Sequence, residues 1–539
     1  MEHSYPHKSI HEHDGSTPAF REREEASSIE LFYDLFFVAN LTSFTTVHAI
    51  DDKETISSYI GFFAILWFTW LQVVMLDVRF GVDSLFERVA KLIHFAVMIT
   101  FAIIGTKFDP SSPHETYSTM RQLSLCLFVS RLVLIAQYGS VMLWVKGHKK
   151  IITPLSIHII AFAIGAVLCF GFFFMFNARS SGQIYIAWYI VLIMEALVVF
   201  ISSSQWRSVS FQHTNLSERC GLLTLIILGE GIIVLTKSIN YVVKGANFSP
   251  GILAQIISAV LIIYFVYMLY FDSRTPHPPS PTRHHFWALA HFPFHIALVL
   301  LMEGTSRFIT WRNAMEIVNH IYTDYDSIWE STNSTTSLAD QFERLSGHVL
   351  QSTQADPVKY NVTGYLNTLR KSGDASSDVA IDSAFEILLT LVNATMKFFK
   401  IEAAKKTTRD PAVGDAKDPY TDLGNALVVY DLVFLYFFLA AGFTLIVLAI
   451  LNILNHKGKW VKGDGIGVAV RVFVGAGIAL VSLVKTDISS EEVFLYSPWM
   501  LPTVMLGLGI VVLVDGVAGW VLPATTAGGK ASTENEEKV

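Results

Sequence analysis

The 539-residue sequence has few charged residues and very few cysteines. Asp, Glu, Lys and Arg together make up 16% of the chain, against roughly a quarter in an ordinary soluble domain. The three cysteines, Cys126, Cys169 and Cys220, lie in or beside apolar segments, which argues against a disulfide framework. Residues 1–28 are polar and contain no apolar core, so we expect no cleavable signal peptide.

Enzyme motifs are also missing from the sequence. It contains no P-loop, no Rossmann glycine pattern, no HExxH and no GxSxG. We therefore predict a protein that is not an enzyme, uses no cofactor or bound metal and does not bind nucleic acid. The histidines of the N-terminal tail could bind a metal weakly, but a disordered polar tail is the simpler interpretation.

Long apolar runs dominate what is present. Hydrophobic residues make up 52% of the chain, and its mean hydropathy is +0.45. The runs are about 18 to 25 residues long, enough for a helix to cross a hydrocarbon core of about 30 Å. We predict an all-α, polytopic membrane helix bundle embedded in a lipid bilayer. About twelve spans are expected, at residues 29–49, 56–76, 89–105, 121–145, 152–176, 184–204, 219–238, 250–271, 286–306, 426–454, 467–485 and 497–520.

The distribution of Lys and Arg among the short loops predicts the orientation. They are concentrated on the side that holds the N-terminus, which the positive-inside rule makes cytoplasmic. Both termini are then cytoplasmic, and the long stretch after the ninth span lies outside or in a lumen. The predicted organisation is a disordered tail (1–28), a nine-helix transmembrane core (29–306), an extracytoplasmic insert (307–425), three further spans (426–521) and a disordered tail (522–539).

One segment of the insert, residues 379–399, is nearly long enough to span a membrane. Its polar residues Asp382, Glu386, Asn393 and Lys397 favour a packed or interfacial amphipathic helix instead.

Glycosylation sequons agree with this orientation. Four N-x-S/T sequons, at Asn247, Asn333, Asn361 and Asn393, fall on the predicted outer side. They predict a glycoprotein of the plasma membrane or an endomembrane of a eukaryote.

The stretch "ELFYDLFFVANL" places Glu30 and Asp34 one helical turn apart in an apolar segment. Ser27 and Glu30 have the spacing of a capping box, in which the acid bonds to free N–H groups at a helix start. That interpretation does not cover Asp34, which lies a turn deeper on the same face. A carboxylate there must be neutral, paired or facing water.

Five stretches of the sequence carry a resemblance to a known family. They are "IELFYDLFFVANL", "WFTWLQVVMLDVRFGVDSLFERV", "SRLVLIAQY", "HTNLSERCGLLTLIILGEGIIVL" and "HFPFHIALVLL". Over roughly residues 27–306 the chain resembles the low-temperature-requirement A (LtrA) family of membrane proteins. The long insert departs from compact bacterial members and resembles fungal ones. The resemblance implies a membrane topology, but no established substrate or reaction.

Ionisable residues inside spans are the candidate functional residues, because each costs at least about 2.5–3.5 kcal/mol at a helix centre when charged and unpaired. The leading hypothesis is a proton- or cation-linked secondary transporter or permease, with Asp34, Glu230 and Arg131 lining a central site. Histidine titrates near neutral pH and would assist proton transfer. The predicted substrate- or ion-binding residues are Glu30, Asp34, Arg131, Glu195, Glu230, His94, His291 and His295.

Structural alternatives remain open for most of these residues. Arg131 could form a fixed bridge with Glu195 or Glu230, and a lone histidine often only hydrogen-bonds a neighbouring helix. Gly229 and Gly231 around Glu230 permit either close helix packing or local unwinding. The charged stretch 77–88 is interpreted first as a surface network. The competing function is a non-transporting sensor or scaffold whose insert binds a partner.

Overall fold

The computed structural model describes most of the chain. The described residues are 10–13, 17–20, 25–47, 50–110, 113–145, 148–177, 183–212, 214–245, 249–273, 280–331, 334–356, 358–401, 419–458, 460, 462–486 and 497–521.

The N-terminal segment, predicted to be a disordered tail, contains a small antiparallel hairpin. Strand β1 (Ile10–His13) pairs with β2 (Thr17–Phe20), with Ile10 opposite Phe20. The rest of the predicted tail up to residue 24, and the predicted tail 522–539, lie outside the described residues.

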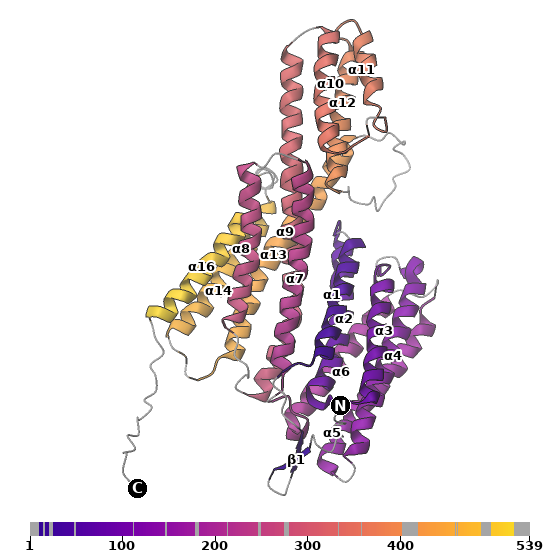
Figure 1. Ribbon diagram of the computed structural model, residues 1–539, viewed down its shortest axis with the longest axis vertical. Helices are drawn as coiled ribbons and strands as arrows, with labels where there is room; N and C mark the ends of the chain where they lie inside the picture. The colour runs from indigo at the N-terminus through magenta and orange to yellow at the C-terminus, as the bar shows by residue number, and fades with distance from the viewer. Residues whose placement is uncertain are drawn as a thin grey trace.

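The first six long helices form one side of the bundle (Figure 1). Polar caps fix two of the helix starts: Asp52 accepts from the Thr55 N–H, and Ser84 accepts from the Glu87 N–H. Helix α2 lies at the centre of this half, with most of its residues buried from Ser58 onward. The helices are α1 (Ser28–Val47), α2 (Lys53–Phe80), α3 (Leu85–Gly105), α4 (Pro113–Trp144), α5 (Lys149–Met175) and α6 (Ile186–Gln205), with short 3₁₀ segments η2 (Gln183–Tyr185) and η3 (Arg207–Val209) beside α6.

The second half of the bundle is built around a very long helix, α9. Helix α13 packs along α9 and α14, while α16 packs against α8 and α14. Helix α1 contacts α2, α3 and also α7, so it joins the two halves. The helices of this half are α7 (Leu216–Gly245), α8 (Pro250–Phe271), α9 (Pro281–Ser331), α13 (Pro419–Asn455), α14 (Lys462–Val481), η4 (Ser482–Thr486) and α16 (Met500–Val521).

The described helices confirm an all-α, multi-pass membrane architecture. Twelve of them are long and apolar enough to cross a membrane, by length and composition. Outward-facing apolar stripes agree with lipid contact: Ile160, Ile164 and Val167 of α5 recur at helical spacing and are each more than half exposed.

The twelve candidate spans match the twelve predicted spans except that one predicted helix is replaced by another. Helix α1, the predicted first span, does not qualify, because Glu30, Asp34 and Asn40 lower its hydropathy. It nevertheless packs within the bundle, against α3 and α7. Helix α12 (Asp378–Phe398) qualifies in its place.

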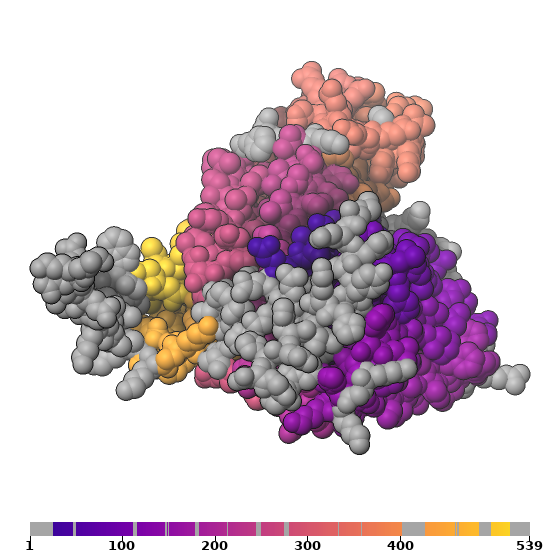
Figure 2. Space-filling model, turned by 60° about the horizontal axis from the view of Figure 1, so that its bottom comes forward, coloured from indigo at the N-terminus to yellow at the C-terminus, as the bar shows by residue number. Residues whose placement is uncertain are grey.

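Helices beyond the bundle form a unit that we call the projecting unit. It consists of the last part of α9 with α10 (Thr335–Ser352), α11 (Val362–Lys371) and α12, which pack on one another. Figures 1 and 2 both show it extending away from one end of the bundle. The helix α12 therefore belongs to a packed helical unit, as its polar residues predict.

The boundary predicted at residue 306 is not a helix end. Helix α9 continues without interruption to Ser331, so one continuous helix connects the bundle to the projecting unit.

Candidate functional site

A buried ionic cluster lies where the first turns of α1 and α7 meet the middle of α2. We call it the Arg219 cluster; it consists of Glu30, Asp34, Trp70 and Arg219. The Arg219 guanidinium donates to Asp34 Oδ1 at 2.6 Å and to Glu30 Oε2 at 3.2 Å. The Trp70 indole N–H donates to Asp34 Oδ1 at 2.7 Å. All four side chains are buried, so the two carboxylates share one cation in a place closed to solvent.

Glu30 acts both as a helix cap and as a member of the ionic cluster. Its carboxylate accepts a long hydrogen bond (3.4 Å) from the Ser27 N–H at the start of α1, which is half of the predicted capping box. The same oxygen accepts from Arg219. The helix cap therefore also orients a member of the ionic cluster.

A second buried pair, Asp77 with Lys91, lies beside the Arg219 cluster. Asp77 is close enough to act electrostatically on both Asp34 and Arg219. The Lys91 ammonium also lies 5.4 Å from the centre of the Tyr33 ring, in cation–π geometry. Among the described residues, the buried carboxylates of Glu30, Asp34 and Asp77 thus lie near the cations of Arg219 and Lys91.

The surface interpretation of the stretch 77–88 is wrong for its first member. Asp77 is buried and paired with Lys91, because α3 folds back against the end of α2. Arg88 and Asp83 do form an exposed pair, at 2.8 Å.

His94 ends a chain of amide and carboxylate contacts on α3 and α4. Gln137 Nε2 donates to Glu87 Oε2 at 2.6 Å, which turns Gln137 Oε1 toward His94. His94 Nε2 then donates to that oxygen at 2.9 Å. His94 is therefore held by a neighbouring helix, and the Glu87 end of the chain is half-buried.

Arg131 on α4 and Glu195 on α6 form a separate buried bridge. Arg131 donates to the two Glu195 oxygens at 3.3 and 2.9 Å. Helix α5 passes close to this bridge at Gly165. A Cβ added at Gly165 would lie 1.9 Å from Glu195 Oε1, so only glycine leaves room for the carboxylate. Of the two predicted partners for Arg131, the structure selects Glu195 and not Glu230.

His291 and His295 on α9 are held in defined tautomers by their partners. The Trp67 indole can only donate, so His295 Nδ1 accepts from it at 3.1 Å and Nε2 donates to Thr224 Oγ1 at 2.8 Å. His291 Nδ1 donates to the Trp287 carbonyl at 2.8 Å, and its Nε2 lies 2.8 Å from the Tyr270 hydroxyl, which can donate or accept. Both rings act as hydrogen-bond bridges between helices.

Glu230 stands apart from these networks. It is 5% exposed, and its Oε1 has no hydrogen-bond partner among the described residues. Thr42 of α1 lies within reach of its carboxylate, and Lys237 of α7 and Glu303 of α9 are its charged neighbours. Helix α7 runs through "LGEGII" without unwinding, and a Cβ at Gly231 would lie 2.6 Å from Met302 Cγ. Gly231 therefore serves close packing of α7 on α9.

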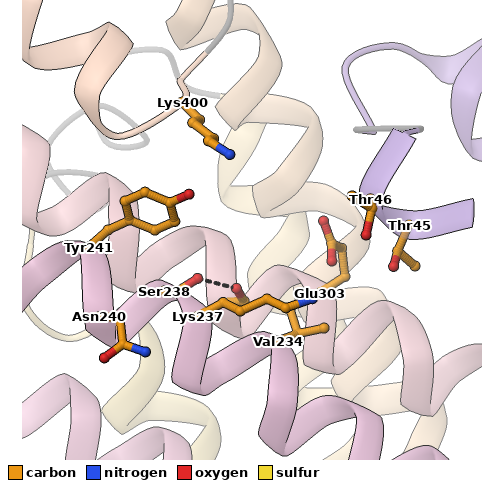
Figure 3. A pocket seen from close by; sticks show the side chains of 10 residues that line it. Thr45, Thr46, Val234, Lys237, Ser238, Asn240, Tyr241, Glu303 and Lys400 are labelled. Atoms are coloured by element: carbon orange, nitrogen blue, oxygen red, sulfur yellow. Dashed lines mark hydrogen bonds between the residues drawn. The ribbon is translucent and has the colours of Figure 1, made fainter. Parts of the chain in front are cut away.

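A pocket of about 410 Å³ opens one turn beyond Glu230, at the end of the bundle that carries the projecting unit. We call it the Glu303 pocket. Figure 3 shows the side chains of Glu303 and Lys237 on one side, with Lys400 and Tyr241 directed toward the same space. Ser238 and Ser306 hydrogen-bond each other in its wall, at 2.5 Å. The lining residues are Thr45, Thr46, Val234, Lys237, Ser238, Asn240, Tyr241, Glu303, Ser306 and Lys400.

The Arg219 cluster and the Glu303 pocket are separated by apolar side chains on the α1 and α7 helices. On α1, Phe37 and Leu41 lie between Asp34 and Thr45, and both are buried. On α7, Leu223 and Ile227 occupy the corresponding stretch and are also buried. At 1.5 Å per residue, the eleven residues from Asp34 to Thr45 correspond to roughly 16 Å.

The predicted glycosylation sites lie in different surroundings. Asn361 is exposed at the start of α11, whereas Asn393 is half-buried within α12 beside the fully buried Thr395. Asn247 and Asn333 lie outside the described residues.

Sequence reasoning overlooked Arg219 and Lys91 as partners. Arg219 is the first residue of the predicted span 219–238, at nearly the same depth as Glu30, the second residue of the predicted span 29–49. Similar depth of opposite charges was the available signal, but it does not say which helices face each other. The structure therefore distributes Asp34, Arg131 and Glu230 over three places, where the prediction had grouped them.

These features define a multi-pass helical membrane protein with ionic clusters buried between its helices. The family described as "Bacterial low temperature requirement A protein (LtrA)" matches residues 25–321. This range is more than half of the chain, and the chain belongs to that family. No curated protein and no solved structure matches the chain. The matched range holds the Arg219 cluster, whereas Lys400 of the Glu303 pocket lies beyond it.

Proposed function

We propose that this protein is a secondary transporter that couples the movement of a small solute to protons or small cations. The observation that carries the proposal is Glu230: a buried carboxylate with an unpartnered oxygen, one helical turn beneath an open pocket. A carboxylate in such a place is expensive unless it binds something. A proton or a cation that enters through the pocket would satisfy it.

The Arg219 cluster supports the same proposal. It places the carboxylates of Glu30 and Asp34 on one buried guanidinium, that of Arg219. A carboxylate that shares its cation in this way is a candidate to take up a proton or cation during transport. The apolar layer of Phe37, Leu41, Leu223 and Ile227 would then act as the barrier between two binding regions.

The topology completes the proposal. Both termini lie in the cytoplasm, and the projecting unit lies outside and carries glycans; the long insert is of the fungal type. The host membrane is the plasma membrane or an endomembrane. The protein acts on no covalent bond and binds no nucleic acid.

The competing proposal is a sensor or scaffold whose projecting unit binds a partner. The size of this unit favours it, since α10, α11 and α12 form a packed body of their own. The two functions differ in what a carboxylate deep in the bundle does, and flux measurements separate them.

The test is flux into proteoliposomes under imposed proton, Na⁺ and K⁺ gradients, with internal pH and membrane potential reported by dyes. The wild type should conduct or exchange at least one of these ions, and Glu230→Gln should lose that flux while keeping its thermal stability. Glu54→Gln is the matched control, because Glu54 is exposed in the first turn of α2. Flux that is unchanged in Glu230→Gln would refute the role of this carboxylate, and a silent wild type would favour the scaffold.

A further inference from the structure

We infer that the Glu303 pocket binds a small organic anion through a carboxylate group, and that Lys400 of the projecting unit supplies part of the site. This inference deepens the proposed transport function, and it rests on that function for the role of the bound anion as the transported solute.

Charge is the first argument for an anion. Lys237 of α7 and Lys400 at the end of α12 both line the pocket, and among the described residues neither ammonium group has a carboxylate within 4 Å. Arg307 donates to the Glu303 carboxylate at 3.0 Å and also lies 3.7 Å from Asp51, while Lys237 acts electrostatically on Glu230. The two lysine side chains still line the pocket without a close ion pair, and a ligand carboxylate would pair with both of them.

The remaining lining fits an anion that also carries hydroxyl groups. Tyr241, Asn240, Thr45 and Thr46 place hydroxyl and amide groups around the pocket. Its volume of about 410 Å³ is within the range of small-molecule sites, about 300–1,000 Å³. The ligand class is therefore a small hydroxycarboxylate.

The backbone at Lys400 has a conformation that favours glycine. Helix α12 ends in a Schellman motif: the Ile401 N–H bonds to the Met396 carbonyl at 2.9 Å and the Lys400 N–H to that of Lys397 at 3.1 Å. Lys400 occupies the left-handed position of this motif, with φ +55°. Glycine fits that position best, so a lysine there costs stability and contributes a charged side chain that points into the pocket (Figure 3).

A structural alternative exists for Lys400. Its ammonium lies 5.4 Å from the centre of the Tyr241 ring, so the contact could simply tie the projecting unit to α7. A tie predicts that loss of Lys400 lowers stability. A binding role predicts that glycine at this position raises stability and removes ligand binding.

A matched control lies in the same unit. Gln354 ends α10 in the same motif, with φ +52° and the Ala355 N–H bonded to the Leu350 carbonyl. Gln354 is exposed and does not line the pocket. Gln354→Gly should therefore raise stability as Lys400→Gly does, with no effect on binding.

The experiment is calorimetric titration of the purified full-length protein with lactate and malate at constant ionic strength, with glycerol as the uncharged probe. At least one carboxylate should bind saturably and glycerol should not. Lys400→Gln and Lys237→Gln should each weaken Kd by about tenfold, the usual loss of one charge-assisted hydrogen bond. Lys400→Gly should raise Tm and weaken binding, whereas Gln354→Gly should raise Tm and leave binding unchanged.

Two results would overturn the inference: no binding of either carboxylate, or binding that both lysine variants leave unchanged. The proposed function fails separately. Lysine-dependent binding without any flux in proteoliposomes would support the anion site and reject transport. Ion flux without lysine-dependent binding would support transport and reject the anion site.

Discussion

Arg219 of α7 donates a 2.6 Å hydrogen bond to Asp34 of α1, and neither side chain is exposed to solvent. The two residues are 185 positions apart in the chain. This contact holds the start of α7 against α1, a helix that contacts both halves of the bundle. It also shows why a carboxylate is tolerated in the apolar stretch "ELFYDLFFVANL".

Removal of one partner from this pair should destabilise the protein strongly. Arg219→Gln should cost about 3–5 kcal/mol, because it leaves the buried carboxylates of Asp34 and Glu30 without their shared cation. Asp34→Asn should cost less, because Arg219 keeps Glu30 as a partner. The double variant should cost less than the two single variants together. Thermal unfolding in nanodiscs measures this, with Arg88→Gln in the exposed pair as the control. Strictly additive losses would show that the two groups do not interact.

The bridge between Arg131 and Glu195 depends on a glycine of α5. Gly165→Ala would place a Cβ 1.9 Å from Glu195 Oε1, so the carboxylate must move away from Arg131. We expect a marked fall in Tm, with loss approaching the about 3–5 kcal/mol of a broken buried pair. Gly171→Ala on the same helix meets nothing within 4 Å and should be neutral or slightly stabilising. Equal behaviour of the two variants would contradict the tight approach at Gly165.

The helical spans could be predicted from sequence because run length and hydropathy are local properties. The pairing of charges could not, since it depends on how each helix is rotated about its axis. Arg131 has two acids at similar depth, Glu195 and Glu230, and only packing of α4 on α6 through α5 decides between them. The pocket was missed for a similar reason: Lys400 reaches it from the end of α12, far along the chain from Lys237.

The neutral tautomer of His295 makes a prediction about pH. His295 accepts from Trp67 and donates to Thr224, and a glutamine amide can do both. His295→Gln should therefore keep near wild-type Tm and the same dependence of flux on pH between about 5 and 8, the range in which histidine usually titrates. His295→Leu should lower Tm, because it leaves the buried Trp67 N–H and Thr224 hydroxyl unpaired, at about 1–3 kcal/mol each. A flux profile that shifts in His295→Gln at unchanged Tm would show that this ring does titrate.

Asn361 and Asn393 give opposite predictions for glycosylation, and together they test the topology. Asn361 is exposed, whereas Asn393 sits in a packed helix and the hydroxyl of Thr395, the third residue of its sequon, is buried and bonded to the Leu391 carbonyl at 2.9 Å. A glycan on Asn393 would have to displace the neighbours of α12. In a glycosylating host, a variant that keeps only the Asn361 sequon should shift in mobility on enzymatic deglycosylation, and one that keeps only Asn393 should not. The shift for Asn361 requires the projecting unit to have entered the lumen during synthesis. If neither the Asn361-only variant nor the wild type shifts, the projecting unit and the mouth of the Glu303 pocket lie on the cytoplasmic side.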